Sequence, residues 1–574
     1  MTEATLKENI HGVLKGLGYS DDIDFTVEHP NETVHGDWST NIALVAAKKL
    51  GKNPRELAEQ IAAGLSASLN SKDIKELSIA GPGFINIHFS DHYFANSIRD
   101  IINQGEFFGR NGDLASQRTM IEFTDPNPFK VLHIGHMMSN TIGEALCRIT
   151  EWNGAEVMRA IYQGDVGMHV AKSVWGMVQN RAAFPHDEDS LEVKIRFLAN
   201  GYAFGNREFE NDQRAKQEIT ATNKMLYEGS NHELNIYYEK GRKWSLEQFA
   251  IIYKRLGTTF DFQFLESEMA KFAVDTVKHY LQEGVFKESE GAIIYEGEKH
   301  GLHTRVFINS EGLPIYEAKE LVLAKAKAEQ YDYERSIVIT GKEQSEYFKV
   351  ILAAMNEVYP GLRAKTTHLS HGHMRLPTGK MSSRTGDVLA AEDVIDDVKA
   401  KALEKIADRD LADSEKEDVA EKVAIAAIKY SVLKQTPGKD IVFDLEKSLS
   451  FEGDSGPYLL YTLLRTKSLI KKAEERNIPL AEVTQPEGWE ITELEKKLYR
   501  FKELIVYSYE ELAPQHLVTY LTEIASLFNS FYGAGKIVDA EDVSSPYKVG
   551  ITEAVNVVLS NGLDILGIKV PEKM

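Results

Sequence analysis

The stretch Asp125-Pro-Asn-Pro-Phe-Lys-Val-Leu-His-Ile-Gly-His136 indicates the fold class, because it lies between a short apolar run, Met120–Thr124, and a segment of helical periodicity, Met137–Trp152. This order places His133 and His136 where a strand leads into a helix. Free backbone N–H groups and the positive end of the helix dipole gather at such a junction, which favours phosphate binding. The stretch therefore predicts a nucleotide-phosphate site at the edge of an α/β sheet.

A second donor-rich stretch, Gly379-Lys-Met-Ser-Ser-Arg-Thr-Gly386, lies far downstream and is bounded by glycines. The Lys380 ammonium and the two serine hydroxyls can close over a polyphosphate and stabilise charge on a leaving group. Together with His133 and His136, they suit attack by a carboxylate on the α-phosphate of ATP, with release of pyrophosphate. Such a reaction depends on positioning and charge neutralisation. Gly135 allows the nucleotide to approach the backbone closely.

The composition of the 574-residue chain is that of an ordinary globular protein, with 43% hydrophobic and 27% charged residues. This length suits about three or four domains. No run of roughly 18 apolar residues predicts a membrane helix, and the first residues lack a signal-peptide pattern. The only cysteine, Cys147, excludes an internal disulfide. We therefore expect a cytoplasmic protein that does not bind membranes.

The formal net charge of −21, considered alone, argues against a nucleic-acid partner, because phosphate binding needs lysine and arginine. Net charge is a sum, however, and a binding surface is local. Arg465, Lys467, Lys471 and Lys472 form one such basic stripe. The sequence contains no cysteine and histidine cluster with zinc spacing, so no metal site of the protein's own is predicted.

The hydrophobic pattern predicts a multidomain α/β protein with three regions. Residues 1–110 read as a small α+β domain, in which Trp38–Leu50 has a helical pattern. Residues 111–390 alternate strands with helices, which predicts a parallel sheet, and a polar helical insertion interrupts it at about 184–244. Residues 391–574 read as an all-helical bundle. The strand candidates of the sheet are Met120–Thr124, Glu156–Tyr162, Thr304–Ile308, Ser336–Thr340 and Thr366–Ser370.

Further stretches make the chain resemble the class I aminoacyl-tRNA synthetases and, over nearly its whole length, the arginyl-tRNA synthetases. They are His35–Asn41, Ala80–Asn86, Glu122–His136, Ser310–Tyr316, Phe451–Tyr458 and Pro571–Met574. The resemblance implies a Rossmann-like catalytic core, an N-terminal domain that contacts the tRNA elbow, and a helical anticodon-binding domain. It implies that ATP and L-arginine give arginyl-adenylate and pyrophosphate, and that arginine then passes to the terminal ribose of its tRNA. Mg²⁺ is expected with ATP, and the protein is expected to be a monomer.

The resemblance also assigns roles to single residues. It implies catalytic roles for His133, His136 and Lys380, and ATP binding by Gly135, Met381, Ser382 and Ser383. It implies an arginine pocket of Glu122, Asn127, Tyr316, Glu320 and Gln344. A guanidinium is a planar fork of donors, which carboxylates and a hydroxyl in fixed positions meet well. The candidates for tRNA binding are Tyr458, Tyr461, Arg465, Asn529, Tyr532 and Lys548.

Three positions depart from the family's pattern. Glu320 replaces an aspartate, which keeps the charge but lengthens the side chain. Ser383 replaces a lysine that class I loops often carry, and we hypothesise that Lys130 supplies this charge from the other side of the phosphates. Lys548 replaces an arginine, which loses bidentate contact with a phosphate backbone.

Other interpretations stay open at this stage. Considered alone, Glu122 is typical of a solvated strand end and Tyr316 of a strand-edge aromatic. The three tyrosines among the tRNA-binding candidates are typical of core residues. A small-molecule nucleotidyltransferase can use a His-x-Gly-His loop, but it does not need the two outer domains. A non-catalytic RNA-binding protein would not need His133, His136 and Lys380. Charging with another amino acid is a further alternative, although the acidic groups near Tyr316 favour a cationic side chain.

Overall fold

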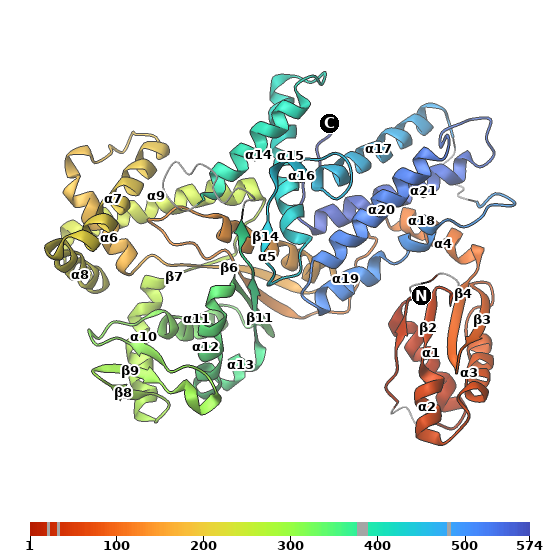
Figure 1. Cartoon of the computed structure of the whole chain (residues 1–574), viewed down its shortest axis with the longest axis horizontal. Coiled ribbons are helices and arrows are strands. Elements are labelled where there is room, and N and C mark those ends of the chain that lie inside the picture. Colours follow the sequence, from red (N-terminus) through yellow and green to blue (C-terminus); the bar gives the residue numbers. More distant parts are fainter. Residues whose placement is uncertain (20–22, 31, 33–34, 376–388, 479–483) are drawn as a thin grey trace. The chain divides into compact units, whose positions relative to one another are not determined.

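The computed structural model of the chain describes residues 1–574 except 20–22, 31, 33–34, 376–388 and 479–483 (Figure 1). It divides into two compact units. The first contains Met1–Arg110, Tyr458–Tyr507 and Thr519–Leu563, and the second contains Asn111–Pro457, Ser508–Val518 and Asp564–Met574. No helix among the described residues is long and apolar enough to cross a membrane.

The N-terminal part of the first unit is an antiparallel sheet with helices. Its strand order is β1 (Val27–Glu28), β2 (Trp38–Thr40), β4 (Phe84–Phe89) and β3 (Ile74–Ala80). The helices are α1 (Glu3–Gly16), α2 (Ile42–Leu50), α3 (Pro54–Ser68) and α4 (Asp91–Gln104), followed by the 3₁₀ turn η2 (Gly105–Phe107). The expected helix over Trp38–Leu50 is wrong in its first part, because Trp38–Thr40 pairs with β4 and the helix begins only at Ile42. This tertiary pairing overrides the local helical spacing.

Among the described residues from Gly456 onward, five helices lie mostly in the first unit. They are α17 (Gly456–Glu475), α18 (Glu493–Leu498), α19 (Phe501–Glu510), α20 (Gln515–Gly533) and α21 (Ser545–Ile565). Leu521, Ile524 and Phe528 of α20 are fully buried and form an apolar stripe. The pair Asn561-Gly562 is typical of a helix end, but α21 continues to Ile565. Gly562 serves packing instead, because a Cβ there would collide with the Leu521 side chain.

The core of the second unit is a five-stranded parallel sheet. Its order is β12 (Thr366–His371), β11 (Arg335–Gly341), β5 (Arg118–Glu122), β6 (Glu156–Gln163) and β7 (Phe262–Leu265). Four of these strands confirm predictions, whereas β7 was not foreseen. Ligands of open α/β sheets bind at the carboxyl ends of the strands where the order reverses, here between β5 and β11. The stretch Asp125–His136, called the signature loop below, follows β5 at this edge.

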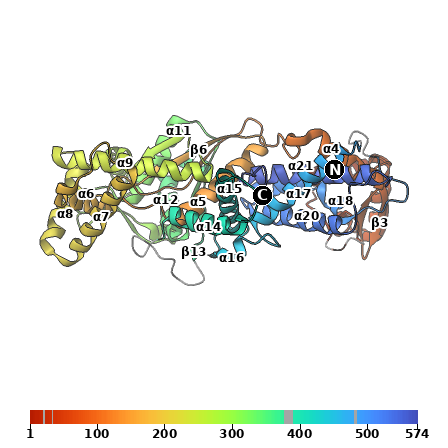
Figure 2. The same cartoon turned by 90° about the horizontal axis from the view of Figure 1, so that it is seen from above.

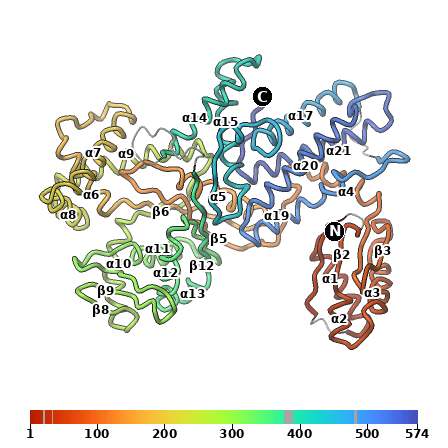
Figure 3. Tube along the Cα trace, in the orientation of Figure 1, coloured from red at the N-terminus to blue at the C-terminus, as the bar shows by residue number. Residues whose placement is uncertain are grey.

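The remaining strand candidate, Thr304–Ile308, is a strand of a different sheet. As β10 (Arg305–Ile308) it pairs in antiparallel register with β9 (Ala292–Tyr295), which pairs with β8 (Lys287–Ser289). Figure 3 shows β8 and β9 apart from β5 and β12. A bridge between Ile308 and Pro314 closes the hairpin that leads into α11 (Tyr316–Gln330). This hairpin therefore positions the start of α11.

Helices connect these strands and form the insertion. The connecting helices are α5 (Ile134–Trp152), α6 (Met168–Gln179), α10 (Glu266–Gln282), α11, α12 (Ser345–Val358) and α13 (Pro360–Lys365). The 3₁₀ turns are η3 (Arg181–Ala183), η4 (Gly297–His300) and η5 (Lys342–Gln344). Figure 2 shows α6 together with α7 (Leu191–Asn211), α8 (Gln213–Glu228) and α9 (His232–Leu256). After them come α14 (Ala391–Ile406), α15 (Asp413–Leu433) and α16 (Leu445–Ser448), and the helical pattern expected here is interrupted by β14 (Ile441–Val442), which pairs with β13 (Met374–Arg375).

Candidate active site

The signature loop has a strained backbone. Thr124, Asp125 and Phe129 have φ angles of 84°, 43° and 70°, in the left-handed region that residues other than glycine rarely adopt. Each such residue costs about 1 kcal/mol or more. Hydrogen bonds offset this cost, since Thr124 N–H donates to the Ser139 hydroxyl at 2.9 Å and Tyr162 N–H donates to the Asp125 carboxylate at 2.8 Å. The surrounding structure therefore fixes the loop in one conformation.

His133 and His136 begin α5 with their rings stacked, 3.6 Å between centroids. His133 is the N-cap residue, and its Nδ1 accepts from Gly135 N–H at 3.1 Å. The Nδ1 of His136 accepts from His133 N–H at 3.1 Å. Burial lowers the pKa of both imidazoles, and that of His136 lies well below its ordinary value. Both rings are therefore neutral with the proton on Nε2, which makes each Nε2–H a donor for a phosphate oxygen.

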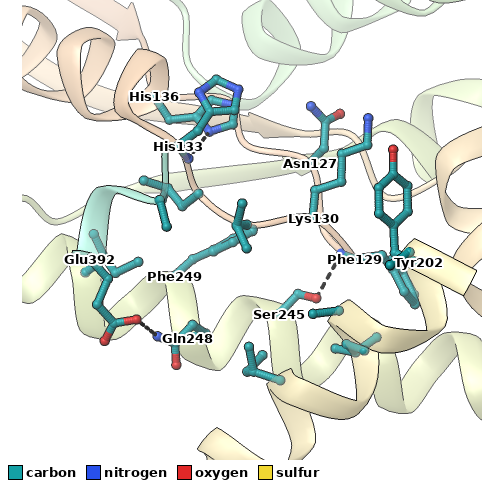
Figure 4. Close-up of a pocket in the computed structure, with 18 residues that line it drawn as sticks. Asn127, Phe129, Lys130, His133, His136, Tyr202, Ser245, Gln248, Phe249 and Glu392 are labelled. Atoms are coloured by element: carbon teal, nitrogen blue, oxygen red, sulfur yellow. Dashed lines mark hydrogen bonds between the residues drawn. The ribbon is translucent and has the colours of Figure 1, made fainter. Parts of the chain in front are cut away.

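A cavity of about 430 Å³ adjoins these histidines (Figure 4). Asn127, Lys130, His133 and His136 line it from the signature loop. Its other walls are α7, α9 and the start of α14, which contribute mostly apolar side chains such as Ile195, Leu198, Tyr202, Phe249 and Ile252. The cavity thus places the donors of the loop beside a water-poor space, where a hydrogen bond to a phosphate is stronger than in water.

Lys130 lies in the same cavity as the two histidines, as the hypothesis about its charge requires. Its ammonium is 5.6 Å from the ring centroid of Tyr202. Burial, followed by the charge of Lys172, lowers the pKa of Lys130. Lys130 and the rings of His133 and His136 are labelled together in Figure 4.

The second motif lies outside the described residues, so the structure does not place Lys380, Met381, Ser382 or Ser383. The chain that follows it is described and returns to the signature loop. Ile134 N–H donates to Leu389 C=O at 3.1 Å, and Ala391 N–H donates to Leu132 C=O at 2.8 Å. Residues 389–391 are therefore bonded to the loop that carries the histidines.

Glu122 is buried at the end of β5, with 1% of its surface exposed, so its interpretation as a solvated strand end is wrong. Its carboxylate accepts from the Lys327 ammonium at 2.5 Å. On α11, Tyr316, Glu320 and Lys327 are spaced by four and seven residues and share one helical face. Tyr316 begins this helix and is not a strand-edge aromatic. These three side chains and Glu122, near the carboxyl end of β5, are called the carboxylate pocket below.

The pocket holds more carboxyl groups than cations. Burial, and then the charge of Glu122, raises the pKa of both Asp125 and Glu320 well above the ordinary values. Lys319 is paired separately with Glu266 at 2.6 Å. A bound cation would favour the ionised forms of these carboxyl groups, so the pocket suits a cationic ligand. Of the other two predicted arginine contacts, Asn127 lines the cavity beside the histidines, and Gln344 follows β11 in η5.

Five of the six predicted tRNA contacts lie together in the first unit. The Arg465 guanidinium lies between the rings of Tyr461 and Tyr532, 4.7 Å and 4.6 Å from their centroids. It also donates to the Asn529 side chain, whose amide donates to the Tyr458 hydroxyl at 3.0 Å. The three tyrosines are not core residues, since Tyr458 and Tyr461 are half-buried and Tyr532 is 42% exposed. Lys548 instead pairs with Asp542 at 2.8 Å.

Three family models match the chain. Residues 98–445 match the catalytic domain of class I tRNA synthetases of the arginine type, which is more than half of the chain. Residues 4–89 match the arginyl tRNA synthetase N-terminal domain, and residues 459–574 match the DALR anticodon-binding domain. The chain belongs to the arginyl-tRNA synthetase family. The matches to both outer regions do not fit the alternative of a small-molecule nucleotidyltransferase.

Similar proteins extend over the same length as this synthetase. The arginine–tRNA ligase of Treponema denticola is 30% identical over 567 residues, covering 96% of this chain and 94% of the relative. The arginine–tRNA ligase of Fusobacterium nucleatum is 29% identical over 546 residues, covering 94% and 93%. The solved arginyl-tRNA synthetase of Thermus thermophilus has the same fold, with a TM-score of 0.81, 23% identity and full coverage of both chains.

The sequence did not identify two residues at the carboxylate pocket of this synthetase. Lys327 lies 205 positions from its partner Glu122, and a pairing over that distance has no local signal. Its spacing of seven residues from Glu320 could have placed it on the same helical face. Tyr162 was expected only as part of a strand. In β6 it follows Ala160, the residue paired with Glu122, by two positions, so both side chains point to the same face of the sheet.

Proposed function

We propose that this arginine–tRNA ligase activates arginine at the signature loop, and that His133 and His136 donate from Nε2 to the phosphates of ATP. The enzyme joins L-arginine to its tRNA through arginyl-adenylate, with release of pyrophosphate. A carboxylate oxygen of arginine attacks the α-phosphorus, and the bond from that phosphorus to the bridging oxygen breaks. The observation that carries this proposal is the pair of neutral imidazoles whose Nδ1 atoms accept backbone N–H groups.

The remaining ATP contacts are assigned by charge and position. Gly135 makes room for the nucleotide, because a Cβ there would lie 3.0 Å from the His133 ring. Lys130 meets the phosphates from the cavity side, and Lys380, Met381, Ser382 and Ser383 meet them from the second motif. Together these groups neutralise the charge that develops on pyrophosphate. Mg²⁺ enters with ATP, whose phosphate oxygens are ligands that it prefers. No group of three or more metal-binding side chains occurs in the part of the chain that the structure describes.

The carboxylate pocket takes the arginine side chain. Glu122, Glu320 and the Tyr316 hydroxyl face the guanidinium, while Asn127 and Gln344 hold the α-amino and carboxylate groups. The longer Glu320 is compatible with this role, because α11 places it on the same face as Tyr316 and Lys327. A cation in the pocket compensates the buried carboxyl groups that Lys327 leaves unpaired.

The outer regions bind tRNA in this proposal. Residues 1–110 contact the tRNA elbow, residues 111–390 form the catalytic domain with its insertion at about 184–244, and residues 391–574 contact the anticodon. The Tyr461, Arg465 and Tyr532 cluster offers planar surfaces on which unstacked bases pack, as single-stranded RNA is usually read. Lys548, held by Asp542, contacts the phosphate backbone as a point charge. We further propose that the enzyme acts as a cytoplasmic monomer.

The test is ATP–pyrophosphate exchange with each amino acid, with and without total tRNA. We expect exchange with arginine alone, and only when tRNA is present. Exchange with a different amino acid would contradict the assignment of the carboxylate pocket. A complete lack of exchange under both conditions would favour the non-catalytic alternative. The double variant His133→Ala/His136→Ala is the control, since it removes both proposed phosphate donors.

A further inference from the structure

The proposed function assigns no role to Tyr162, a side chain beside the carboxylate pocket. It lies near the carboxyl end of β6, beside β5 in the parallel sheet. Glu122 of β5 pairs with Ala160 of β6, so these two side chains point to the same face of the sheet. Tyr162 follows Ala160 by two residues and therefore points to that face as well. Its phenol lies one step further toward the carboxyl ends, where ligands of such sheets bind.

Helix α11 covers this face. The 2.5 Å bond from Lys327 to Glu122 fixes the helix over β5. Tyr162 packs in one core cluster with Ala318 and Leu321 of the same helix. Burial raises the pKa of Tyr162 well above its ordinary value, and the charges of Glu266 and Glu320 raise it further. The phenol therefore lies near carboxyl groups of two helices, Glu266 of α10 and Glu320 of α11.

The Tyr162 hydroxyl has no hydrogen-bond partner among the described residues, although it is buried and the residue is only 4% exposed. A buried hydroxyl without a partner is costly, and such groups are rare in native proteins. The two buried lysines of α11 are satisfied, since Lys319 bonds Glu266 and Lys327 bonds Glu122. An unpaired hydroxyl among carboxylates is explained if a ligand supplies the partner.

A count of acceptors indicates which ligand group this is. A guanidinium presents five N–H donors in one plane. One carboxylate oxygen of Glu122 already accepts from Lys327, which reduces the acceptors that the pocket offers. The Tyr162 oxygen supplies one more acceptor on the same face. An ammonium has only three donors and no planar fork, so it would not need this additional oxygen.

We propose that Tyr162 is a specificity-determining residue of the arginine pocket, whose hydroxyl oxygen accepts an N–H of the substrate guanidinium. The inference rests on the arginine pocket proposed above and adds a contact that the sequence did not assign. Because no described residue bonds the hydroxyl, we expect it to contribute to arginine binding and not to the stability of the free enzyme. This asymmetry separates a binding role from a core-packing role.

The test is Tyr162→Phe in the full-length enzyme, which removes only the hydroxyl. We expect the KM for arginine to rise about tenfold, because a hydrogen bond to a charged group is lost. The kcat and the KM for ATP should change less than twofold, since the contact is made equally in the ground and transition states. Lysine, used as a competitor, should lose less than twofold in affinity. The melting temperature without arginine should stay the same or rise.

Tyr280→Phe is the matched control. Tyr280 packs against the same core cluster, but its hydroxyl already donates to Val358 C=O at 3.2 Å. Its loss should lower the melting temperature without changing the KM for arginine.

An unchanged KM for arginine in Tyr162→Phe would overturn the inference. So would a fall in melting temperature with parallel losses in all kinetic constants, which is the signature of a core tyrosine. The arginine-induced shift in melting temperature of the unmodified enzyme separates the two levels of the proposal. No shift at all would overturn both the pocket and the inference. A normal shift in the unmodified enzyme, equally large in Tyr162→Phe, would overturn the inference alone.

Discussion

At the scale of single residues, Asp125 and Glu320 should make arginine binding depend on pH. Burial and the charge of Glu122 raise the pKa of both carboxyl groups. Carboxyl groups with raised pKa values stabilise the free enzyme most at low pH, below the ordinary values near 4, and this contribution is lost as pH rises through the raised values. Bound arginine favours the ionised forms of these two carboxyl groups, because its guanidinium is positively charged. Its KM should therefore fall, and its stabilising effect should grow, as pH rises from about 5 to about 9.

Arginine-induced shifts in melting temperature across this pH range measure the effect directly. Glu320→Gln is the control, because it removes one titrating group and should flatten the dependence. An arginine KM that does not vary with pH in the unmodified enzyme would contradict the ionisation argument. The positive φ angle of Asp125 makes Glu320 the better position to vary.

Lys130 gives a second prediction at this scale. If it replaces the lysine that is absent at Ser383, Lys130→Ala should lower kcat for exchange about a hundredfold, as loss of one transition-state donor does. The KM for arginine should stay within twofold. Lys216→Ala is the matched control, since Lys216 lies 5.5 Å from the Phe209 ring on the insertion and lines no part of the cavity. An unchanged exchange rate in Lys130→Ala would disprove the hypothesis that Lys130 replaces the lysine absent at Ser383.

The residues that the sequence identified are those with a local signature. His133 and His136 were predicted to lie where a strand leads into a helix, and the structure confirms that α5 begins there. Lys327 and Tyr162 have no such signature, because their partners come from strands and helices far away in the chain. The charge state of Glu320 could not be predicted either, since it depends on burial beside Glu122.

At the scale of elements, a buried ion pair joins α11 to β5 in addition to their shared apolar core. The Lys327 and Glu122 side chains are 4% and 2% exposed. Lys327→Met would leave Glu122 buried without a partner, which should destabilise the enzyme by about 3–5 kcal/mol. Urea unfolding measures this change. Lys325→Met on the same helix should cost less than about 1 kcal/mol, because its pair with Glu329 is exposed. Adding Glu122→Gln to Lys327→Met should recover part of the lost unfolding free energy. A small loss in Lys327→Met, or no recovery in the double variant, would contradict this account.

Helices and strands were predicted well where the local periodicity is clear. They were predicted poorly where pairing between distant strands determines the conformation. Four of the five strands of the parallel sheet were visible locally. Strand β2 was not, because pairing with β4 decides its conformation. β10 was assigned to the wrong sheet for the same reason, since a four-residue strand does not reveal its partner. The pair Asn561-Gly562 does not end α21, because Gly562 serves packing against Leu521.

At the scale of the whole molecule, the net charge of −21 hides a local cationic cluster that we expect to bind tRNA. The basic stripe is visible in the sequence, but the stacking of Arg465 between Tyr461 and Tyr532 depends on the packing of α17 against α20. Neither composition nor spacing predicts that geometry. Binding of a polyanion by an acidic protein therefore depends on where its accessible cations lie.

Arg465→Ala should raise the KM for tRNA about tenfold, because it removes both a cation and the planar group stacked between two aromatic rings. Arg465→Lys should restore only part of this loss, since an ammonium keeps the charge without the planar surface. Aminoacylation kinetics with varied tRNA measure the effect. The KM values for arginine and ATP should not change, because Arg465 and the carboxylate pocket belong to different compact units. Lys497→Ala, which removes a lysine paired with Glu523, is the control and should leave the KM for tRNA within twofold. Equal effects of the Arg465 and Lys497 variants would show that the cluster contributes only general charge and no specific stacking surface for tRNA.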